Sequence, residues 1–400
     1  MRFTIDTKLF RKPVLKIGLF VYLALTIFEG YLSRGVFGSL LKYYGLALLL
    51  FWLLTTIKDG RHVRFGKTVT ALILWLLVCL FSLIWAPGYY WGQYYALAIG
   101  NMVLIMLMVD NIDWDSNDLE WFLFFYKVSA MIFAVLMIQN ADLYHDKGIR
   151  YTLNVGDKEI DPNELAGLLI PGLLASLHSL LSRRNRTLLR TMLDLVIIAL
   201  VTIAILMGGS RGGMLGLTVG GGAYILAWVF KEKGGRVVIR FVLIGLLLFI
   251  LSALVIPQVD DSLIRRVMPE NLLVDQGSGR LEIWERAFQI WKKNPIFGIG
   301  LGGFISLTGK AVHNTYLLIL TDTGIIGFTF WFAAVSFTFV QAWRNGDDFD
   351  ISLLLSMLVI IFFLDAYQKK YMWNVFFLSL VSIKRFSLSF RGVMLSNYSV

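Results

Sequence analysis

The sequence has little charge, one cysteine and few histidines, and each scarcity excludes a class of protein. Cys79 is the only cysteine, so a disulfide framework and a cysteine-based metal site are both excluded. The four histidines do not cluster in the sequence, which argues against a metal site, and no cofactor is expected. Charged residues make up 16% of the chain and hydrophobic residues 57%, a composition that is not that of a soluble globular domain.

Apolar runs long enough to cross a bilayer recur along the whole chain. They predict an all-α polytopic membrane protein, a single integral membrane domain over residues 1–400. The first run follows a basic start but lacks a small-residue cleavage pattern, so we interpret it as an uncleaved span. The twelve predicted spans are 14–29, 38–57, 68–86, 92–109, 119–138, 163–181, 190–208, 211–230, 239–257, 313–341, 351–367 and 372–387.

The net charge of +10 comes from short basic clusters between the apolar runs. No basic stripe carries interleaved aromatic residues, so a nucleic-acid partner is not expected. Lys and Arg are more frequent in every second connecting segment, and the positive-inside rule then places both termini in the cytoplasm. The segment "DNIDWDSND" (110–118) is the one predicted inside loop without a basic residue.

Two predicted outside segments, 139–162 and 258–312, are long enough to hold structure of their own. The second contains "GRLEIWERAFQIWKKNPIFGIGLGGF", in which four large apolar residues recur at helical spacing with charged residues around the other side. This pattern predicts an amphipathic helix that ends near Pro295. The four apolar residues are Leu281, Trp284, Phe288 and Trp291.

The stretch "ILMGGSRGGMLGL" places Arg211 between two glycine pairs, at the outer junction of the seventh and eighth spans. A guanidinium cannot be neutralised by deprotonation and is expensive to hold near lipid, so its presence indicates an anionic partner. The alternative is a snorkelling arginine in a tight hairpin, with glycines that only allow close helix packing. Both interpretations remain open on the sequence.

His313, in "AVHNTYL", is the one histidine that lies both in a predicted outside loop and at the start of a span. Imidazole is the side chain best suited to accept a proton near neutral pH, so His313 is a candidate general base. The alternative is a helix-terminal residue hydrogen-bonded at the interface. His62 and His178 fall toward the inside, and His145 has no neighbouring polar constellation.

Arg280 opens the amphipathic helix just after "DQGSG", where a guanidinium beside glycines can clamp a phosphate. An exposed helix residue is the alternative. The nearby "GIGLGG" is formally a G-x-G-x-x-G, but no strand precedes it and no βαβ unit surrounds it. We therefore reject a dinucleotide site there; a backbone nest for an anion and a plain turn remain.

The stretch "DPNELAG" predicts the start of the sixth span, with Asp161 as N-cap, Pro162 in the first turn and Glu164 at N3. A catalytic role for either carboxylate is the second interpretation. Three charged residues lie inside predicted spans and are costly enough to face the protein interior. They are Lys127, Asp322 and Asp365.

Arg211, Arg280 and His313 together comprise two fixed cations and one titratable base on the same predicted side. This combination suits a diphosphate-bearing lipid, because the leaving group must be stabilised while a hydroxyl is deprotonated.

In this order, "GGSRGGMLGL", "GRLEIWERAFQIWKKNPIFGIGLGGF" and "HNTYLLILTDTGIIGF" resemble the O-antigen polymerase and O-antigen ligase (Wzy-type) superfamily of bacterial membrane glycosyltransferases. The resemblance implies a GT-C-like bundle of twelve spans and metal-independent, inverting transfer of glycans from undecaprenyl diphosphate. It implies that Arg211 and Arg280 engage the diphosphate and that His313 activates the acceptor hydroxyl. Residues expected to contact the substrate also include Asn314, Glu164 and Arg286.

The sequence thus predicts an inner-membrane polymerase that joins lipid-linked repeat units into capsule, exopolysaccharide or O-antigen, with its active site on the extracytoplasmic side. A ligase differs only in the acceptor, which would be lipid A core, a protein or a cell-wall glycan. A transporter is a third alternative, although the two repeated halves typical of transporters are not found. The expected partners are the lipid-linked donor and acceptor, the bilayer, a flippase and a chain-length regulator.

Overall fold

The computed structural model describes residues 7–33, 39–143, 151–155, 158–182, 187–231, 280–345 and 347–396. The predicted ninth span, 239–257, lies outside the described residues, as do His145 and the first part of the predicted loop 258–312, up to residue 279.

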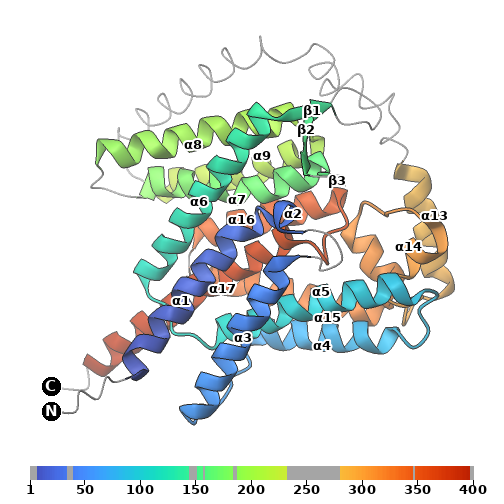
Figure 1. The fold of residues 1–400 in the computed structure, drawn as a ribbon, viewed down its shortest axis with the longest axis horizontal. Coiled ribbons are helices and arrows are strands. Elements are labelled where there is room, and N and C mark those ends of the chain that lie inside the picture. Colours follow the sequence, from blue (N-terminus) through green and yellow to red (C-terminus); the bar gives the residue numbers. More distant parts are fainter. Residues whose placement is uncertain are drawn as a thin grey trace.

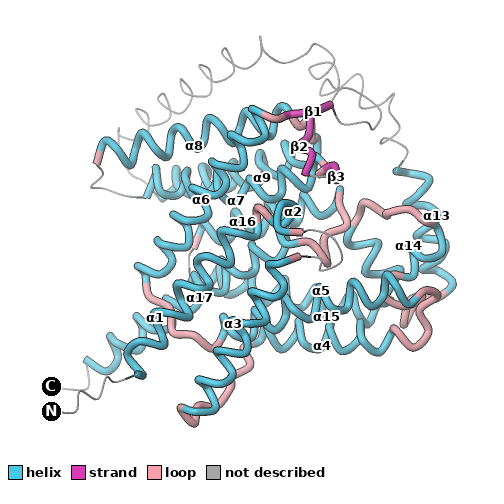
Figure 2. Tube along the Cα trace, in the orientation of Figure 1, coloured by secondary structure: helices cyan, strands magenta, loops and turns pink. Residues whose placement is uncertain are grey.

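Helices dominate the described residues and cross one another in a bundle (Figures 1 and 2). They are α1 (Thr7–Thr26), α2 (Glu29–Leu32), α3 (Leu40–Lys58), α4 (Lys67–Ser82), α5 (Tyr89–Asp110), α6 (Ser116–Gln139), α7 (Pro162–Ser182), α8 (Leu188–Met207), α9 (Arg211–Lys231), α13 (Arg280–Lys293), α14 (Gly303–Thr308), α15 (Thr315–Asn345), α16 (Asp348–Ile360), the 3-10 helix η3 (Ile361–Phe363) and α17 (Lys370–Ser396).

A small antiparallel sheet, magenta in Figure 2, departs from the all-α expectation. Its strands are β1 (Ala141–Leu143), β2 (Tyr151–Val155) and β3 (Lys158–Glu159), paired in that order. Ala141 lies opposite Leu153, and Val155 lies opposite Lys158. The predicted outside segment 139–162 therefore does hold structure of its own, directly before α7.

Seven of the described helices are long and apolar enough to cross a membrane. They coincide with the predicted spans 38–57, 92–109, 119–138, 163–181, 190–208, 211–230 and 313–341. Two shorter apolar helices, Pro13–Thr26 and α4, coincide with the first and third predicted spans. The chain is therefore a polytopic helical membrane protein, and the total of twelve spans stays a prediction.

The predicted eleventh span, 351–367, is not one continuous helix. Helix α16 ends at Ile360, η3 follows, and Leu364 is extended with φ −145° and ψ 154°. The extended backbone lets the Leu364 carbonyl oxygen accept a hydrogen bond from the Thr315 hydroxyl at 2.5 Å, and the Ala366 N–H donates back to that hydroxyl at 2.8 Å. These contacts with α15 replace the hydrogen bonds that a longer helix would have made.

Contacts between loops divide the bundle into two ends. We call them the histidine end, which contains His313, and the acidic end, which contains the segment 110–118. At the acidic end, Asp118 binds Lys16, and Asp110 binds Lys384 at 2.8 Å. Lys16 lies in α1 and Lys384 lies in α17, so these ion pairs tie helices to the acidic segment, and the side of the membrane that this end faces stays a prediction.

The acidic segment without basic residues is explained by these ion pairs. Asp110 accepts the Gly66 N–H at 2.8 Å in addition to its bond with Lys384, and the Asp118 carboxylate accepts the N–H of the N-cap residue Asp115 at 2.9 Å while binding Lys16. The carboxylates of 110–118 thus neutralise lysines of neighbouring segments, and a basic residue in the segment would compete with those lysines.

Candidate active site at the histidine end

The segment between α16 and α17 contacts three other segments at the histidine end. We call residues 361–370 the 361–370 connection. The Phe363 ring lies against Gly212 in the first turn of α9, where a Cβ added to the glycine would lie 2.7 Å from the ring. The neighbouring Phe362 packs edge-on against Trp284 of α13, with ring centroids 5.4 Å apart. The connection thus joins the first turn of α9 to the second turn of α13.

The predicted arginines begin these two helices. Arg211 is the first residue of α9, Arg280 is the first residue of α13, and both are half-buried. Ser210, just before Arg211, donates to the Asn163 side chain of α7 at 2.6 Å and caps α9 by accepting the Gly213 N–H at 2.9 Å. The start of α9 is therefore fixed to α7 as well as to the connection.

The glycines after Arg211 serve close packing. A Cβ at Gly216 would lie 2.5 Å from Ile360, and one at Gly220 would lie 2.8 Å from the Ser352 carbonyl oxygen, so α9 and α16 approach backbone to backbone. This confirms one half of the packing interpretation of the "GGSRGG" stretch. Close packing accounts for the glycines and not for the guanidinium of Arg211.

His313 lies in a turn that Asp365 of the 361–370 connection holds in place. The carboxylate of Asp365 accepts the Val312 N–H at 2.9 Å and the Asn314 N–H at 3.2 Å. On the other side, the Trp284 indole N–H donates to the Val312 carbonyl oxygen at 3.0 Å. The turn is thus fixed between α13 and the 361–370 connection. The segment that begins with His313 therefore lies beside the segments that begin with Arg211 and Arg280.

His313 itself has a backbone conformation that few side chains adopt. Its φ is +55°, in the left-handed region, and among the described residues it is the only non-glycine there. Such a conformation costs of order 1–3 kcal/mol and persists only where the surroundings enforce it. The hydrogen bonds to Asp365 on both sides of His313 supply that constraint, and the imidazole remains partly exposed.

Asp365 also interacts electrostatically with His313. Burial raises the pKa of the Asp365 carboxyl, while His313 and the neighbouring backbone N–H groups oppose that rise. The carboxylate belongs to the non-helical part of the 361–370 connection, and it places a negative charge beside an imidazole that is predicted to gain a positive one.

Asn314 caps α15. Its side-chain oxygen accepts the Leu317 N–H at 3.1 Å, its carbonyl oxygen accepts the Leu318 N–H, and only 5% of the residue is exposed. The side-chain oxygen is therefore already engaged in the fold. A contact between Asn314 and the substrate stays a prediction, and it would have to use the amide nitrogen.

The amphipathic helix predicted after "DQGSG" is present as α13, but its buried face differs from the predicted one. Ala287 is fully buried, whereas Leu281 is 57% exposed and Phe288 is 38% exposed. The Ala287 carbonyl oxygen accepts the Thr321 hydroxyl of α15 at 3.3 Å. Arg286 lies on the exposed surface of α13, so its predicted substrate contact requires a ligand that reaches that surface.

The glycine loop "GIGLGG" forms a backbone nest, and the anion in it is the protein's own Asp322. The carboxylate accepts the Gly302 N–H at 2.8 Å, the Phe304 N–H at 3.1 Å and the Tyr367 hydroxyl at 2.7 Å. The Gly300 N–H donates to the Asp322 backbone oxygen at 2.8 Å. Because the nest is filled by a buried side chain, neither a dinucleotide nor another external anion has a place there.

The predicted start of α7 is confirmed. Asp161 accepts the Asn163 N–H at 2.7 Å, and Pro162 is the first helical residue. Glu164 pairs with Lys369 of the 361–370 connection at 2.7 Å, and this carboxylate raises the pKa of the lysine. The ion pair with Lys369 does not test the predicted contact between Glu164 and the substrate, which stays a prediction.

The 361–370 connection could not be predicted from the sequence. The cost of placing Asp365 against lipid indicates an interior position, but the partners of its carboxylate are backbone N–H groups, which no sequence pattern reports. Tyr367, which binds Asp322, was not singled out at all.

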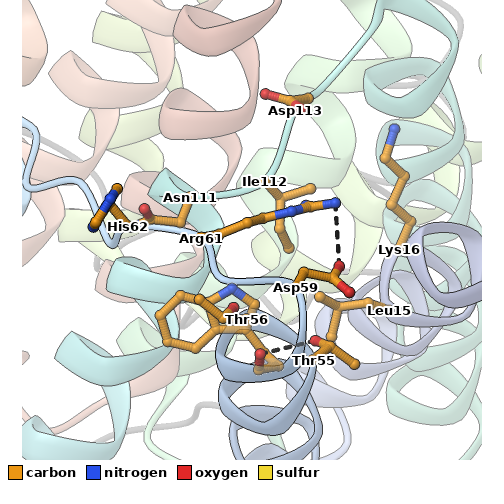
Figure 3. A pocket seen from close by; sticks show the side chains of 11 residues that line it. Leu15, Lys16, Thr55, Thr56, Asp59, Arg61, His62, Asn111, Ile112 and Asp113 are labelled. Carbon is orange, nitrogen blue, oxygen red and sulfur yellow. Dashed lines mark hydrogen bonds and ion pairs between the residues drawn. The ribbon is translucent and has the colours of Figure 1, made fainter. Parts of the chain in front are cut away.

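A pocket at the acidic end contains none of the predicted site residues. Figure 3 shows Arg61 reaching across it to Asp59, an ion pair of 3.3 Å, with His62 and Lys16 on its walls. His178 binds the Tyr224 hydroxyl at 2.8 Å in the same half of the bundle. Within the part of the chain that the structure describes, three or more potential metal ligands do not gather anywhere.

Comparison with known proteins points to the same segments. No curated protein matches the chain. Residues 195–332 match the family described as O-antigen ligase. The matched stretch contains Arg211, Arg280 and His313 and ends before the 361–370 connection. Over this stretch, which carries the predicted residues at one end of a polytopic helical bundle, the chain is similar to the O-antigen ligase family.

Proposed function

We propose that this protein is a membrane glycosyltransferase that polymerises undecaprenyl-diphosphate-linked repeat units of capsule, exopolysaccharide or O-antigen. The observation that carries the proposal is the 361–370 connection, which holds the first turn of α9, the second turn of α13 and the turn of His313 at one end of the bundle. A reaction between a lipid diphosphate and a sugar hydroxyl needs cations and a base in one place.

In the proposed reaction, His313 removes the proton from a hydroxyl of the acceptor sugar. The oxygen attacks the anomeric carbon of the donor glycan, and the bond from that carbon to the diphosphate oxygen breaks with inversion. The electron pair leaves with the lipid diphosphate, whose charge Arg211 and Arg280 stabilise. Asp365 stabilises the positive charge that His313 gains, so the proposal requires no metal.

The proposed location is a bacterial inner or plasma membrane, with the histidine end on the extracytoplasmic side and both termini in the cytoplasm. The lipid-linked donor and acceptor would arrive from the bilayer through lateral diffusion. A flippase that delivers them and a chain-length regulator are the partners we expect.

A ligase is the second candidate, because the matched family is described as O-antigen ligase. It would use the same donor, the same arginines and the same base. The difference lies in the acceptor, which would be lipid A core, a protein or a cell-wall glycan rather than a second lipid-linked repeat unit.

The test is complementation of a polymerase-deficient strain that supplies candidate lipid-linked repeats. Wild type is compared with His313→Ala, Arg211→Ala and Arg280→Ala at matched membrane expression. Arg344→Ala is the matched control, because Arg344 is exposed at the far end of α15 from His313.

Long glycan ladders that disappear in the three site variants and persist in the control would support the polymerase. Glycan attached to another acceptor without lengthening would indicate the ligase. An unchanged ladder in the His313 variant would contradict the assignment of the general base.

A further inference from the structure

The histidine end carries a second group of cations beside the proposed reaction centre. We call Lys42, Lys369 and Lys370 the lysine cluster. Lys369 pairs with Glu164 at 2.7 Å, and Lys370 pairs with Glu29 at 3.4 Å. The ammonium of Lys42 lies over the ring of Tyr94, 4.7 Å from its centroid. The beginning of α3 and the end of the 361–370 connection thus bring the lysines together, and α5 adds the ring of Tyr94.

The electrostatics show that these lysines share one environment. The hydroxyl of Tyr94 is in electrostatic range of Lys369, Glu29 and Glu164, and Lys42 repels Lys370. Three carboxylates, Glu29, Glu164 and Asp161, are in electrostatic range of the paired lysines, but only Glu29 and Glu164 form ion pairs with them. Among the described residues, Lys42 has no carboxylate within ion-pair distance, and the side chain of Lys370 is only 4% exposed. A buried cation cannot snorkel to water, which weakens the interpretation of these lysines as interfacial anchors.

Aromatic side chains extend from the lysine cluster along the first two turns of α5. Tyr90 packs against Trp91 with ring centroids 5.2 Å apart, and Trp91 packs against Tyr94 at 6.2 Å. Tyr90 is 73% exposed and Tyr94 is 44% exposed. Partly exposed tyrosine and tryptophan rings combine an apolar face with a polar group, and this pairing suits the faces and hydroxyls of a sugar.

The first turn of α7 connects the lysine cluster with the arginine side of the site. Asn163 binds Ser210, next to Arg211, whereas the following residue, Glu164, binds Lys369. Adjacent residues of one helix therefore contact the two cationic groups separately. The arrangement provides two places for phosphates at the same end of the bundle.

We propose that the lysine cluster holds the diphosphate of the acceptor lipid, while Arg211 and Arg280 hold the diphosphate of the donor. The inference rests on the proposed function, because a polymerase joins two substrates that both carry a lipid diphosphate. The acceptor diphosphate stays intact during transfer and so needs cations but no leaving-group stabilisation. The aromatic rings of α5 contact the sugars next to it.

The experiment counts bound diphosphates on the purified full-length protein. Native mass spectrometry with geranylgeranyl diphosphate as the probe is expected to show two binding events on wild type. Lys42→Gln should weaken one event about tenfold, since a charged hydrogen-bond donor is lost and no carboxylate is left unpaired. Arg211→Ala combined with Arg280→Ala should weaken the other. Lys58→Gln, at the opposite end of α3, is the matched control and should change neither event.

A second variant guards against misfolding. Lys370→Gln combined with Glu29→Gln removes a whole ion pair, so no buried charge is left uncompensated, and it should weaken the same event as Lys42→Gln. A further arm replaces the probe with phosphatidylglycerol, which carries a single phosphate and should not compete at an equal concentration.

Two events that the lysine and arginine variants remove separately would support the inference. One event, lost in the arginine variant and unaffected by Lys42→Gln, would overturn the second site and leave the proposed function standing. One event lost in both kinds of variant would overturn it as well, since the cations would form a single site. Equal competition by phosphatidylglycerol would reduce the cluster to a phospholipid contact. No diphosphate binding in wild type would contradict the proposed function itself.

Discussion

The two ends of the bundle use their carboxylates for different purposes. Toward the acidic end, carboxylates bind lysines of other helices: Asp110 binds Lys384 at 2.8 Å, and Asp194 binds Lys127 at 2.7 Å. At the histidine end, one fully buried and one partly buried carboxylate accept hydrogen bonds mainly from backbone N–H groups. These carboxylates are Asp322, which binds the glycine loop, and Asp365, which binds the His313 turn.

The difference shows what each end must hold in place. An ion pair between side chains fixes one helix against another, and helices already satisfy their own backbone groups. A carboxylate that accepts backbone N–H groups fixes the conformation of a segment that is not helical. The acidic end is therefore built for packing, while the histidine end holds short loops in defined conformations, as a catalytic site requires.

The largest effect is expected at His313. Asparagine tolerates the left-handed backbone better than most residues do, so His313→Asn preserves the turn and removes only the imidazole. If His313 is the general base, glycan transfer should fall by about 10²–10⁴-fold. The measurement is the rate of chain elongation in membranes with matched amounts of protein.

The control for this prediction is thermal stability. The melting temperature of His313→Asn should stay close to that of wild type, because the hydrogen bonds that Asp365 accepts come from the backbone N–H groups of the neighbouring residues Val312 and Asn314. A variant that elongates glycans at the normal rate would show that another group removes the proton.

The second-largest effect is expected on the stability of the protein when an ion pair toward the acidic end is broken. Lys127 and Asp194 are almost fully buried and joined at 2.7 Å, with Ser179 also donating to the carboxylate at 2.8 Å. Lys127→Met leaves a buried carboxylate without its cation and should lower the free energy of unfolding by about 3–5 kcal/mol. Chemical denaturation in detergent measures this loss.

The double variant Lys127→Met with Asp194→Leu should recover most of the lost stability, because both charges are removed together. The activity of each folded molecule should not change in either variant. A loss of activity at full stability would mean that the acidic end participates in the reaction. It would contradict the assignment of the acidic end to packing alone.

Asp365→Asn should lower both the stability of the protein and the rate of glycan elongation. The amide of asparagine presents an N–H₂ group where the carboxylate accepted two backbone N–H groups, so the turn of His313 loses part of its support. The free energy of unfolding should fall by about 1.5–3 kcal/mol, and elongation should fall with it. Melting curves and elongation rates on the same preparation test the pair of effects, and a variant with both properties intact would remove Asp365 from the site.

The spans could be predicted because the bilayer imposes their length. Seven long apolar helices lie where the hydropathy predicts them, and the Asp161 cap was read from four consecutive residues. The break after Ile360 could not be predicted in this way, because "IFFLDAYQKK" contains no glycine or proline. Its extended backbone depends on Thr315, about fifty residues earlier in the chain.

The buried face of α13 shows a second limit of the sequence. Apolar residues at 281, 284, 288 and 291 fit a helical stripe, but Ile283, Ala287 and Ile290 form a second stripe beside it. The period of a helix identifies the helix without choosing between two adjacent stripes. Packing against α15 makes that choice by burying Ala287.

The smallest effect is expected for Glu164, and it sharpens the comparison of the two ends. Glu164 and Lys369 form an ion pair at 2.7 Å, as Lys127 and Asp194 do, but their side chains are 23% and 40% exposed. Water screens such a pair, so Glu164→Gln should lower the free energy of unfolding by only about 0.2–1 kcal/mol. Chemical denaturation beside Lys127→Met measures both pairs on one scale. Equal losses in the two variants would mean that burial does not distinguish these two ion pairs, whereas a several-fold difference would show that the Glu164–Lys369 pair stays accessible to an arriving anion.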